Sequence, residues 1–190
     1  CVDIGVFDFD ALTSFALEKG IGLAVIGPDD PLAAGIVDAF EAKKIPVFGP
    51  RANAAEIEGS KAFMKDLLKK YEIPTAAYEN FEDYEKALAY LRSQKAPIVV
   101  KTDGLAAGKG VTVAQTIEEA EKALHDAMIG GSFGSAGSKV VIEEFMAGEE
   151  MSILAFVDGE TVRAMPAAQD HKPIFDGDQG PNTGGMGTYS

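Results

Sequence analysis

Two lysines mark the part of this chain best suited to bind phosphate. Lys101 closes the apolar run 98–100, and Lys109 stands in the glycine-rich stretch 103–110 that follows. Glycines let the backbone approach a ligand closely, and backbone N–H groups together with a lysine ammonium can hold phosphate oxygens. One lysine–phosphate pair about 4 Å apart contributes on the order of 4 kcal/mol at an effective dielectric of ~20. The pattern predicts a flap over phosphates, and a plain hairpin tip is the alternative.

A second candidate group is a cluster of carboxylates that follows the predicted strand 139–145. Glu143 and Glu144 lie at the end of that strand, and Glu149 and Glu150 follow shortly after it. Carboxylates at this density suit ribose hydroxyls or a divalent metal ion. The alternative is a charged, solvated turn, because exposed glutamates are normal on protein surfaces.

Two polar stretches fall in the region after Met165, where no regular periodicity is visible. They are Asp170-His171-Lys172 and the glycine-rich run 182–187. Polar residues on loops carry function more often than those on regular elements. The run 130–134 matches G-x-S-x-G, but a helix is expected before it, whereas a nucleophile elbow needs a strand there. We therefore expect no serine nucleophile at this position.

The first third of the chain alternates between strand and helix signals. Strands are expected over 2–6, 23–26 and 46–48. Between them we expect one helix from a cap at Asp10, and a second from a cap at Asp30, with proline next. Strand, helix, strand, helix, strand is the order of a parallel α/β layer.

The rest of the chain mixes helices with more closely spaced strands. Residues 52–71 read as helical with a break near Gly59-Ser60, and Ile73-Pro74 ends that segment. Further helices are expected from a cap at Asn80 to Ser93, and from Thr116, whose capping box includes Glu119, to Met128. Strands are expected over 97–101, 111–114, 139–145, 152–157 and 161–165, and loops over 130–137 and 177–187.

Composition excludes several classes of protein. The chain has 190 residues, with 17 Lys and Arg against 30 Asp and Glu, and a net charge of −13. Nucleic acid and anionic membranes both attract clustered positive charge, so neither is an expected partner. Cys1 is the single cysteine, and no apolar run reaches the ~18 residues of a membrane helix. These features predict a cytoplasmic protein in a reducing compartment.

Five blocks of sequence together resemble one known family. They are Glu58–Lys61, Lys101–Gly110, Val141–Glu150, Gln169–Lys172 and Gly180–Tyr189, in that order along the chain. In these blocks the chain resembles the phosphoribosylamine–glycine ligases (glycinamide ribonucleotide synthetases), which belong to the ATP-grasp enzymes. Five blocks in the family's order are far more specific than any one of the motifs alone.

The resemblance implies a fold and its division into domains. Residues 1–59 would form a partial parallel α/β layer of the Rossmann-like, pre-ATP-grasp kind, and residues 60–74 a helical linker. Residues 75–190 would form an incomplete ATP-grasp domain. Its flap subdomain would cover about 75–146, and its larger subdomain would begin over 147–190. Both ends of the chain are expected to be truncated relative to the family.

The resemblance also implies a reaction and the residues that serve it. Family members join glycine to 5-phosphoribosylamine through glycyl phosphate, using ATP and magnesium, in purine biosynthesis. The residues implied to bind ATP are Lys61, Lys101, Asp103, Gly104, Gly108, Lys109, Gly110, Glu143, Glu144, Phe145, Met146 and Glu150. Those implied to bind the other substrates are Gly27, Pro28, Asp29, Asp170, Lys172, Asn182, Thr183, Gly184 and Gly185. Lys101 and Asp170 are implied to be catalytic.

The metal is expected to lie outside this chain. The family's ligands for Mg²⁺ or Mn²⁺ would follow Ser190, and the chain itself would supply none. The 190-residue chain is therefore expected to be inactive alone. Its expected partners are small molecules: glycine, 5-phosphoribosylamine and ATP.

Two departures from the family's pattern keep other readings open. Asp29 stands where glutamate is usual, and Pro173 stands where arginine is usual. They motivate a related ATP-grasp ligase with another carboxylate substrate as an alternative. A non-catalytic nucleotide-binding fragment is a further one. A dinucleotide-dependent oxidoreductase is disfavoured, because no G-x-G-x-x-G motif follows a predicted strand.

Overall fold

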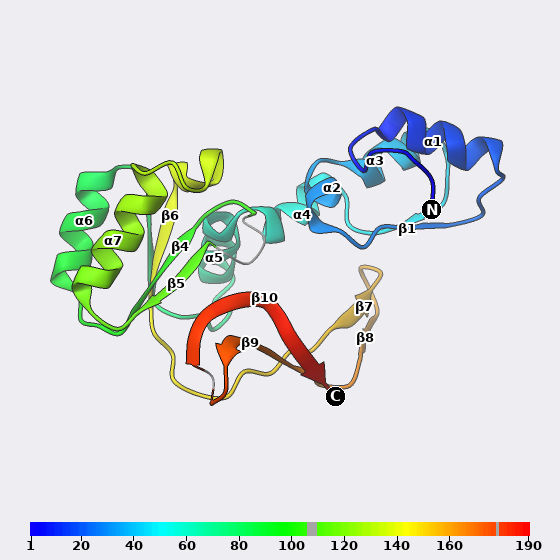
Figure 1. The fold of residues 1–190 in the computed structure, drawn as a ribbon. Helices are drawn as coiled ribbons and strands as arrows, with labels where there is room; N and C mark the ends of the chain where they lie inside the picture. The colour runs from blue at the N-terminus through cyan, green and yellow to red at the C-terminus, as the bar shows by residue number, and fades with distance from the viewer. Residues whose placement is uncertain (106–109, 178) are drawn as a thin grey trace. The chain divides into compact units, whose positions relative to one another are not determined.

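The computed structural model describes residues 1–105, 110–177 and 179–190 (Figure 1). Its internal contacts divide the chain into two units. The first unit holds Cys1–Thr75 together with Asp103–Leu105, and the second holds Ala76–Thr102 and the described part of 106–190. Both units combine helices and strands, which confirms the predicted α/β class.

The first unit is built around a short pair of parallel strands. In chain order its elements are α1 (Phe9–Glu18), β1 (Ala24–Val25), α2 (Asp29–Ala33), α3 (Ile36–Ala42), β2 (Val47–Phe48), α4 (Ala52–Gly59) and α5 (Lys61–Lys70). Ala24 pairs with Val47 in the parallel ladder. Beside the strands lies a core made of Ala16, Ile36, Val37, Phe40 and Ile45. The strand–helix–strand crossover confirms the predicted parallel layer.

The first ten residues differ from their prediction. Residues 2–6, all of them described, form no strand. A strand needs a neighbour to complete its backbone hydrogen bonds, and the described ladder of β1 joins it to β2 alone. Helix α1 also begins earlier than predicted. Its cap is Asp8, whose carboxylate accepts the Ala11 N–H at 3.0 Å, while Asp10 lies inside the first turn.

The helix predicted from a cap at Asp30 is two helices. Pro28 precedes α2, so Asp30 lies within the helix and caps nothing. The chain then leaves the helical region at Gly35, whose φ is +92°, before α3 begins. A positive φ is accessible to glycine at little cost, and it breaks the helix here. The later break between α4 and α5 falls at Ser60, as predicted.

The second unit contains an antiparallel sheet of four strands. They are β3 (Tyr78–Phe81), β4 (Ile98–Thr102), β5 (Val111–Ala114) and β6 (Val140–Glu144), in the spatial order β3-β6-β4-β5. Helices α6 (Tyr84–Ser93) and α7 (Ile117–Met128) lie side by side on one face of this sheet (Figure 1). Leu91 and Leu124 from these helices pack with Val100 and Ile142 in a fully buried core.

Local capping explains where α6 and α7 begin. The hydroxyl of Thr116 accepts the Glu119 N–H at 3.2 Å, and the Glu119 carboxylate accepts the Gln115 N–H at 2.8 Å. This confirms the predicted capping box. The predicted cap at Asn80 is wrong, because Asn80 lies inside β3. Asp83 caps α6 instead, and its carboxylate accepts a first-turn N–H at 2.9 Å.

Two hairpins follow the sheet. One pairs β7 (Ala155–Val157) with β8 (Val162–Ala164), and the other pairs β9 (Gln169–Phe175) with β10 (Gln179–Tyr189) (Figure 1). The predicted loop over 177–187 is therefore largely strand, and the loop over 130–137 contains a short 3₁₀ helix, Gly134–Ser138. Glycines permit the irregular ladder, because the register of β10 shifts twice and Gly185 has a φ of +129°.

Candidate functional site

The clearest polar pair of the second unit joins Lys101 and Glu143. Val99 lies opposite Glu143 in the β4–β6 ladder, and Lys101 lies opposite Val141. Alternate residues of a strand face the same side, so the two polar side chains are diagonal neighbours on the face opposite α6 and α7. Lys101 Nζ donates to Glu143 Oε2 at 2.9 Å. The structure thus brings together two residues that were singled out separately.

Burial gives this pair its significance. The Glu143 side chain is 5% exposed and that of Lys101 is 26% exposed. Removing one partner of a buried ion pair costs about 3–5 kcal/mol, yet replacing both partners with apolar residues is often neutral or stabilising. A sheet gains little stability from such a pair over an apolar one. Chemistry at this face explains its presence better than stability does.

The chain leaves β6 with its backbone held and its side chains accessible. Glu144 donates its N–H to the Ala77 carbonyl at 2.9 Å, and its carboxylate accepts the Ala77 N–H at 2.9 Å. Phe145 and Met146 follow, and these residues are 41% and 65% exposed. An aromatic ring beside a thioether offers apolar contact to a flat ligand. Glu150 lies further along in an exposed segment.

The start of the glycine-rich stretch is bound to the N-terminus of α5. The Asp103 carboxylate accepts the Ser60 hydroxyl at 3.0 Å and the Ala62 N–H at 2.6 Å. Lys61 Nζ donates to the Gly104 carbonyl at 2.9 Å. Three predicted ATP ligands, Lys61, Asp103 and Gly104, therefore lie together in the first unit.

Of the remaining predicted ligands in this stretch, the structure describes one and leaves two undescribed. Gly108 and Lys109 lie outside the described residues. Gly110 is buried, and its carbonyl accepts the Thr102 N–H at 2.8 Å. This hydrogen bond continues the antiparallel pairing of β4 with β5 by one step beyond the strands.

The β9–β10 hairpin gathers most of the predicted substrate residues. Asp170 and Lys172 form an ion pair on β9. The Thr183 hydroxyl donates to the Lys172 carbonyl at 2.9 Å and accepts the Gly185 N–H at 3.0 Å. A side chain at Gly185 would place its Cβ 3.0 Å from Asp170 Oδ1, so glycine is needed for this close approach. Asn182 lies opposite Pro173 in the ladder, and Gly184 follows Thr183.

Aromatic packing supports the base of this hairpin. The rings of His171 and Tyr189 stack with their centres 5.8 Å apart. Ladder partners Asp170 and Thr188 lie next to them. His171 is thereby placed as a support for the hairpin that carries Asp170 and Lys172.

The predicted residues of the N-terminal layer follow the first strand. Gly27 comes just after β1, Pro28 precedes α2, and Asp29 is the first residue of that helix. In open α/β sheets, ligands bind beyond the carboxyl ends of the parallel strands. Gly27, Pro28 and Asp29 occupy that position in the first unit, and the Asp29 side chain is exposed.

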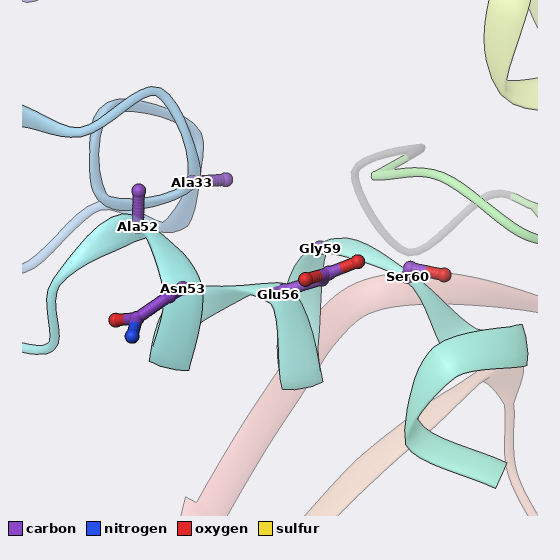
Figure 2. Close-up of a pocket in the computed structure, with 6 residues that line it drawn as sticks. All are labelled: Ala33, Ala52, Asn53, Glu56, Gly59 and Ser60. Atoms are coloured by element: carbon purple, nitrogen blue, oxygen red, sulfur yellow. The ribbon is translucent and has the colours of Figure 1, made fainter. Parts of the chain in front are cut away.

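A groove of about 410 Å³ runs along α2 and α4 in the first unit (Figure 2). Its lining residues are Ala33, Ala52, Asn53, Glu56, Gly59 and Ser60. None of these is a predicted site residue, and this described lining includes a carboxylate at Glu56 but no cation. Phosphate would be repelled by that charge. The groove is therefore a poor candidate for a phosphate subsite, although Ser60 at its end contacts Asp103.

Two partly or fully buried polar residues were not assigned a role from the sequence. Ser60 caps α5 and also reaches Asp103. Lys65 is 2% exposed and donates to the Thr75 hydroxyl at 2.7 Å. The helix break at Gly59-Ser60 was a usable signal for Ser60, since serine is a preferred cap. A lysine on a helix gives no signal of burial.

The described part of the chain holds neither a cluster of metal-binding side chains nor a helix that could span a membrane. Over the described ranges, no group of three or more His, Cys, Asp and Glu side chains converges on a point where a metal ion could sit. Within the same ranges, every helix is too short or too polar to cross a membrane.

Comparison with known proteins confirms the family resemblance. Residues 1–58 match the model of the phosphoribosylglycinamide synthetase N domain, and residues 59–190 match that family's ATP-grasp (A) domain. The phosphoribosylamine–glycine ligase of Vibrio cholerae is 59% identical over 189 residues, and that of Escherichia coli K12 is 58% identical. In both cases all of this chain is covered, but only 44% of the relative.

A solved structure gives the same result for the fold. The crystal structure of phosphoribosylamine–glycine ligase from Thermotoga maritima superposes with a TM-score of 0.76 at 36% identity. The match covers 93% of this chain and 43% of that one. The chain thus spans less than half the length of the relatives and the structure that it matches.

Proposed function

The chain belongs to the phosphoribosylglycinamide synthetase family, and from this we propose that the protein containing it is an ATP-dependent carbon–nitrogen ligase. The reaction joins the carboxylate of glycine to the amine of 5-phosphoribosylamine. It yields glycinamide ribonucleotide, ADP and phosphate. The observation that carries the proposal is the 57–60% identity, over the whole of this chain, to enzymes named phosphoribosylamine–glycine ligase.

The nucleotide is the ligand that the donor set of this chain suits best. Lys101 supplies a cation on β4, and Lys61 supplies one at the start of α5; both ammonium groups suit phosphate oxygens. Bound ATP would supply the phosphoryl group that makes the glycine carboxylate reactive. Mg²⁺ or Mn²⁺ would accompany it, and no residue of this chain is proposed as a ligand of the metal. Asp103, Gly104, Gly108, Lys109 and Gly110 are the proposed flap residues.

The end of β6 is the proposed binding surface for the nucleoside. Glu143 and Glu144 can accept hydrogen bonds from an amino group, and the exposed Phe145 and Met146 can contact a purine ring. Glu150 is the proposed ligand of the ribose hydroxyls, since a carboxylate accepts from two neighbouring hydroxyls. Positioning and charge stabilisation then carry the catalysis, with no covalent intermediate on the protein.

The β9–β10 hairpin is proposed to hold the other substrates. The Lys172 ammonium suits the phosphate of phosphoribosylamine, and the Asp170 carboxylate suits an amine. Asp170 is the proposed catalytic residue of this group because an amine must be oriented for attack. Thr183 and Gly185, held next to them, offer further donors, as do the neighbouring residues Asn182 and Gly184. Gly27, Pro28 and Asp29 are proposed to approach the same substrate from the N-terminal layer.

The test is ADP release by the full-length protein. We expect release to require both glycine and 5-phosphoribosylamine, and Lys101→Ala to weaken Mg·ATP binding strongly. Replacing glycine with other amino acids separates this reaction from that of a related ligase, the alternative raised by Asp29 and Pro173. ADP release that depends on another amino acid would replace the proposed substrate. Unchanged nucleotide affinity in Lys101→Ala would contradict the phosphate role of that lysine.

Partners and location follow from this function. The proposed partners are small molecules alone, and the proposed location is the cytoplasm, where purine precursors are made. The strongly acidic balance of the chain disfavours a nucleic-acid partner, so none is proposed.

A further inference from the structure

Asp103 makes a long-range contact with the N-terminus of α5, in addition to the local cap that Ser60 provides there. Asp8, Asp83 and Thr116 cap α1, α6 and α7 through bonds to an N–H three residues away. Asp103 bonds instead to residues 41 to 43 positions before it, at the N-terminus of α5. A local cap stabilises its own helix. A long-range one also fixes where its own segment lies.

Ser60 uses its hydroxyl in two directions. Its oxygen accepts the Phe63 N–H at 3.1 Å, which caps α5, and its proton is directed to the Asp103 carboxylate at 3.0 Å. The carboxylate also accepts the Ala62 N–H at 2.6 Å. Hydrogen bonds to an ionised acceptor are about twice as strong as neutral ones. All of these groups are partly or fully buried, apart from the Phe63 amide.

The backbone beyond this carboxylate holds Lys61. The Asp103 carbonyl accepts the Lys61 N–H at 3.1 Å. The Lys61 ammonium donates to the Gly104 carbonyl at 2.9 Å and reaches the Asp103 carbonyl at 3.4 Å. The side-chain contact of Ser60 with Asp103 therefore sets the position of the two carbonyls that orient the Lys61 ammonium.

We propose that Ser60 and Asp103 are positioning residues that present Lys61 to a nucleotide phosphate. This rests on the proposed function, and it gives Asp103 a task other than direct contact with ATP. The N-terminus of α5 would otherwise attract an anion. The Asp103 carboxylate already occupies that position, so the phosphate meets the lysine side chain and not the helix amides.

The test measures the dissociation constant of ATP, together with kcat and KM for ATP, on the full-length protein. Asp103→Ala removes the contact, and we expect about a tenfold rise in the dissociation constant and in KM, with kcat changed less. Asp103→Asn keeps one acceptor for the Ala62 N–H and should recover most of the loss. Ser60→Ala should cost about threefold, and Ser60→Thr, which keeps the hydroxyl, should bind ATP as the parent does.

The decisive measurement is the dissociation constant of ATP for the double variant that combines Ser60→Ala with Asp103→Ala. If Ser60 acts through Asp103, then Ser60→Ala adds nothing to Asp103→Ala, because the contact is already lost. If Ser60 affects ATP binding independently of Asp103, the two losses multiply and the proposal is overturned. Tighter binding by Asp103→Ala would also overturn it, since it would show the α5 amides to be the phosphate site. The Ser60 variants keep the test open if Asp103→Ala does not fold.

Asp83→Ala is the matched control. It also deletes an aspartate carboxylate that accepts a backbone N–H at a helix N-terminus. That hydrogen bond is local, however, and lies on α6. We expect it to lower thermal stability and to leave the dissociation constant of ATP unchanged. An equal rise in both variants would mean a merely structural effect. A parent protein that binds ATP without ligating glycine would remove the proposed function alone; one that binds no ATP would remove both.

Discussion

Two lysine–carboxylate pairs of the second unit lie on sheets of different kinds. Lys101 and Glu143 are 42 residues apart and meet across β4 and β6, with side chains 26% and 5% exposed. Lys172 and Asp170 are two residues apart on β9, with side chains 45% and 32% exposed. The first pair belongs to a sheet covered on its other face by α6 and α7. The second belongs to a two-stranded hairpin.

Burial decides which of these two ion pairs can hold a site in one arrangement. Water and salt screen an exposed pair, which contributes roughly 0–1 kcal/mol. A buried pair is screened far less, and loss of one partner leaves a charge without compensation. We infer that the four-stranded sheet holds its polar groups in one arrangement, whereas the hairpin holds its pair weakly and leaves it adjustable.

The largest expected effect tests the packing that underlies this contrast. Leu124 is fully buried under the sheet, and Leu154, before β7, is 57% exposed. Leu124→Ala should lower the free energy of unfolding of the 190-residue chain by about 3 kcal/mol, from lost transfer energy plus a cavity. Leu154→Ala is the matched truncation and should change it by less than about 1 kcal/mol. Urea unfolding followed by circular dichroism measures both, and equal losses would erase the contrast.

The next effect concerns the buried pair itself. Glu143→Gln keeps the shape but removes the charge that Lys101 requires, and we expect a loss of about 2 kcal/mol in the free energy of unfolding. Glu144→Gln is the control on the same strand, because Glu144 is exposed and its carboxylate accepts the Ala77 N–H at 2.9 Å. It should cost less than about 1 kcal/mol. Reversal of this order would show that burial does not set the strength of these contacts.

Local signals explain how much of the fold was predictable. The Thr116 capping box and the break at Ser60 depend on neighbours in the chain, and the structure has both. The sequence predicts loop over β10, because its four glycines leave no alternation of apolar and polar side chains. Its ladder to β9 is made by backbone N–H and carbonyl groups. Every residue has both of these groups except proline, which lacks the N–H. A side-chain pattern cannot reveal such a strand.

The sequence suggests which residues belong to the candidate site but not which contacts join them. Lys101 and Glu143 each stand out by type and position. Their pairing depends on the register between β4 and β6, which is set by the packing of the whole sheet. The contact of Ser60 with Asp103 is of the same kind. Long-range pairs of this sort need the tertiary structure, since no local spacing specifies them.

A smaller effect is expected for the exposed pair. Asp170→Asn should change the free energy of unfolding by less than about 0.5 kcal/mol at physiological salt. That change should disappear at about 1 M salt, where the screening length is near 3 Å. The loss caused by Glu143→Gln should persist at the same salt concentration. The measurement is urea unfolding of both variants at two ionic strengths, and a salt-resistant loss in Asp170→Asn would mean that the hairpin pair is held as firmly as the buried one.

The smallest effect lies in the turn between β7 and β8, where support is entirely local. The Thr161 and Glu160 N–H groups donate to Asp158 Oδ1 at 2.8 and 3.2 Å, and they lower the pKa of Asp158 below its ordinary value of 3.8. Because the folded pKa is the lower one, the stabilisation is complete above the unfolded value and is lost as the pH falls through the folded value. A carboxyl NMR titration should give a midpoint below 3.8, and Asp158→Asn should remove this part of the acid sensitivity. A midpoint at or above the ordinary value would show that these hydrogen bonds do not hold the turn in solution.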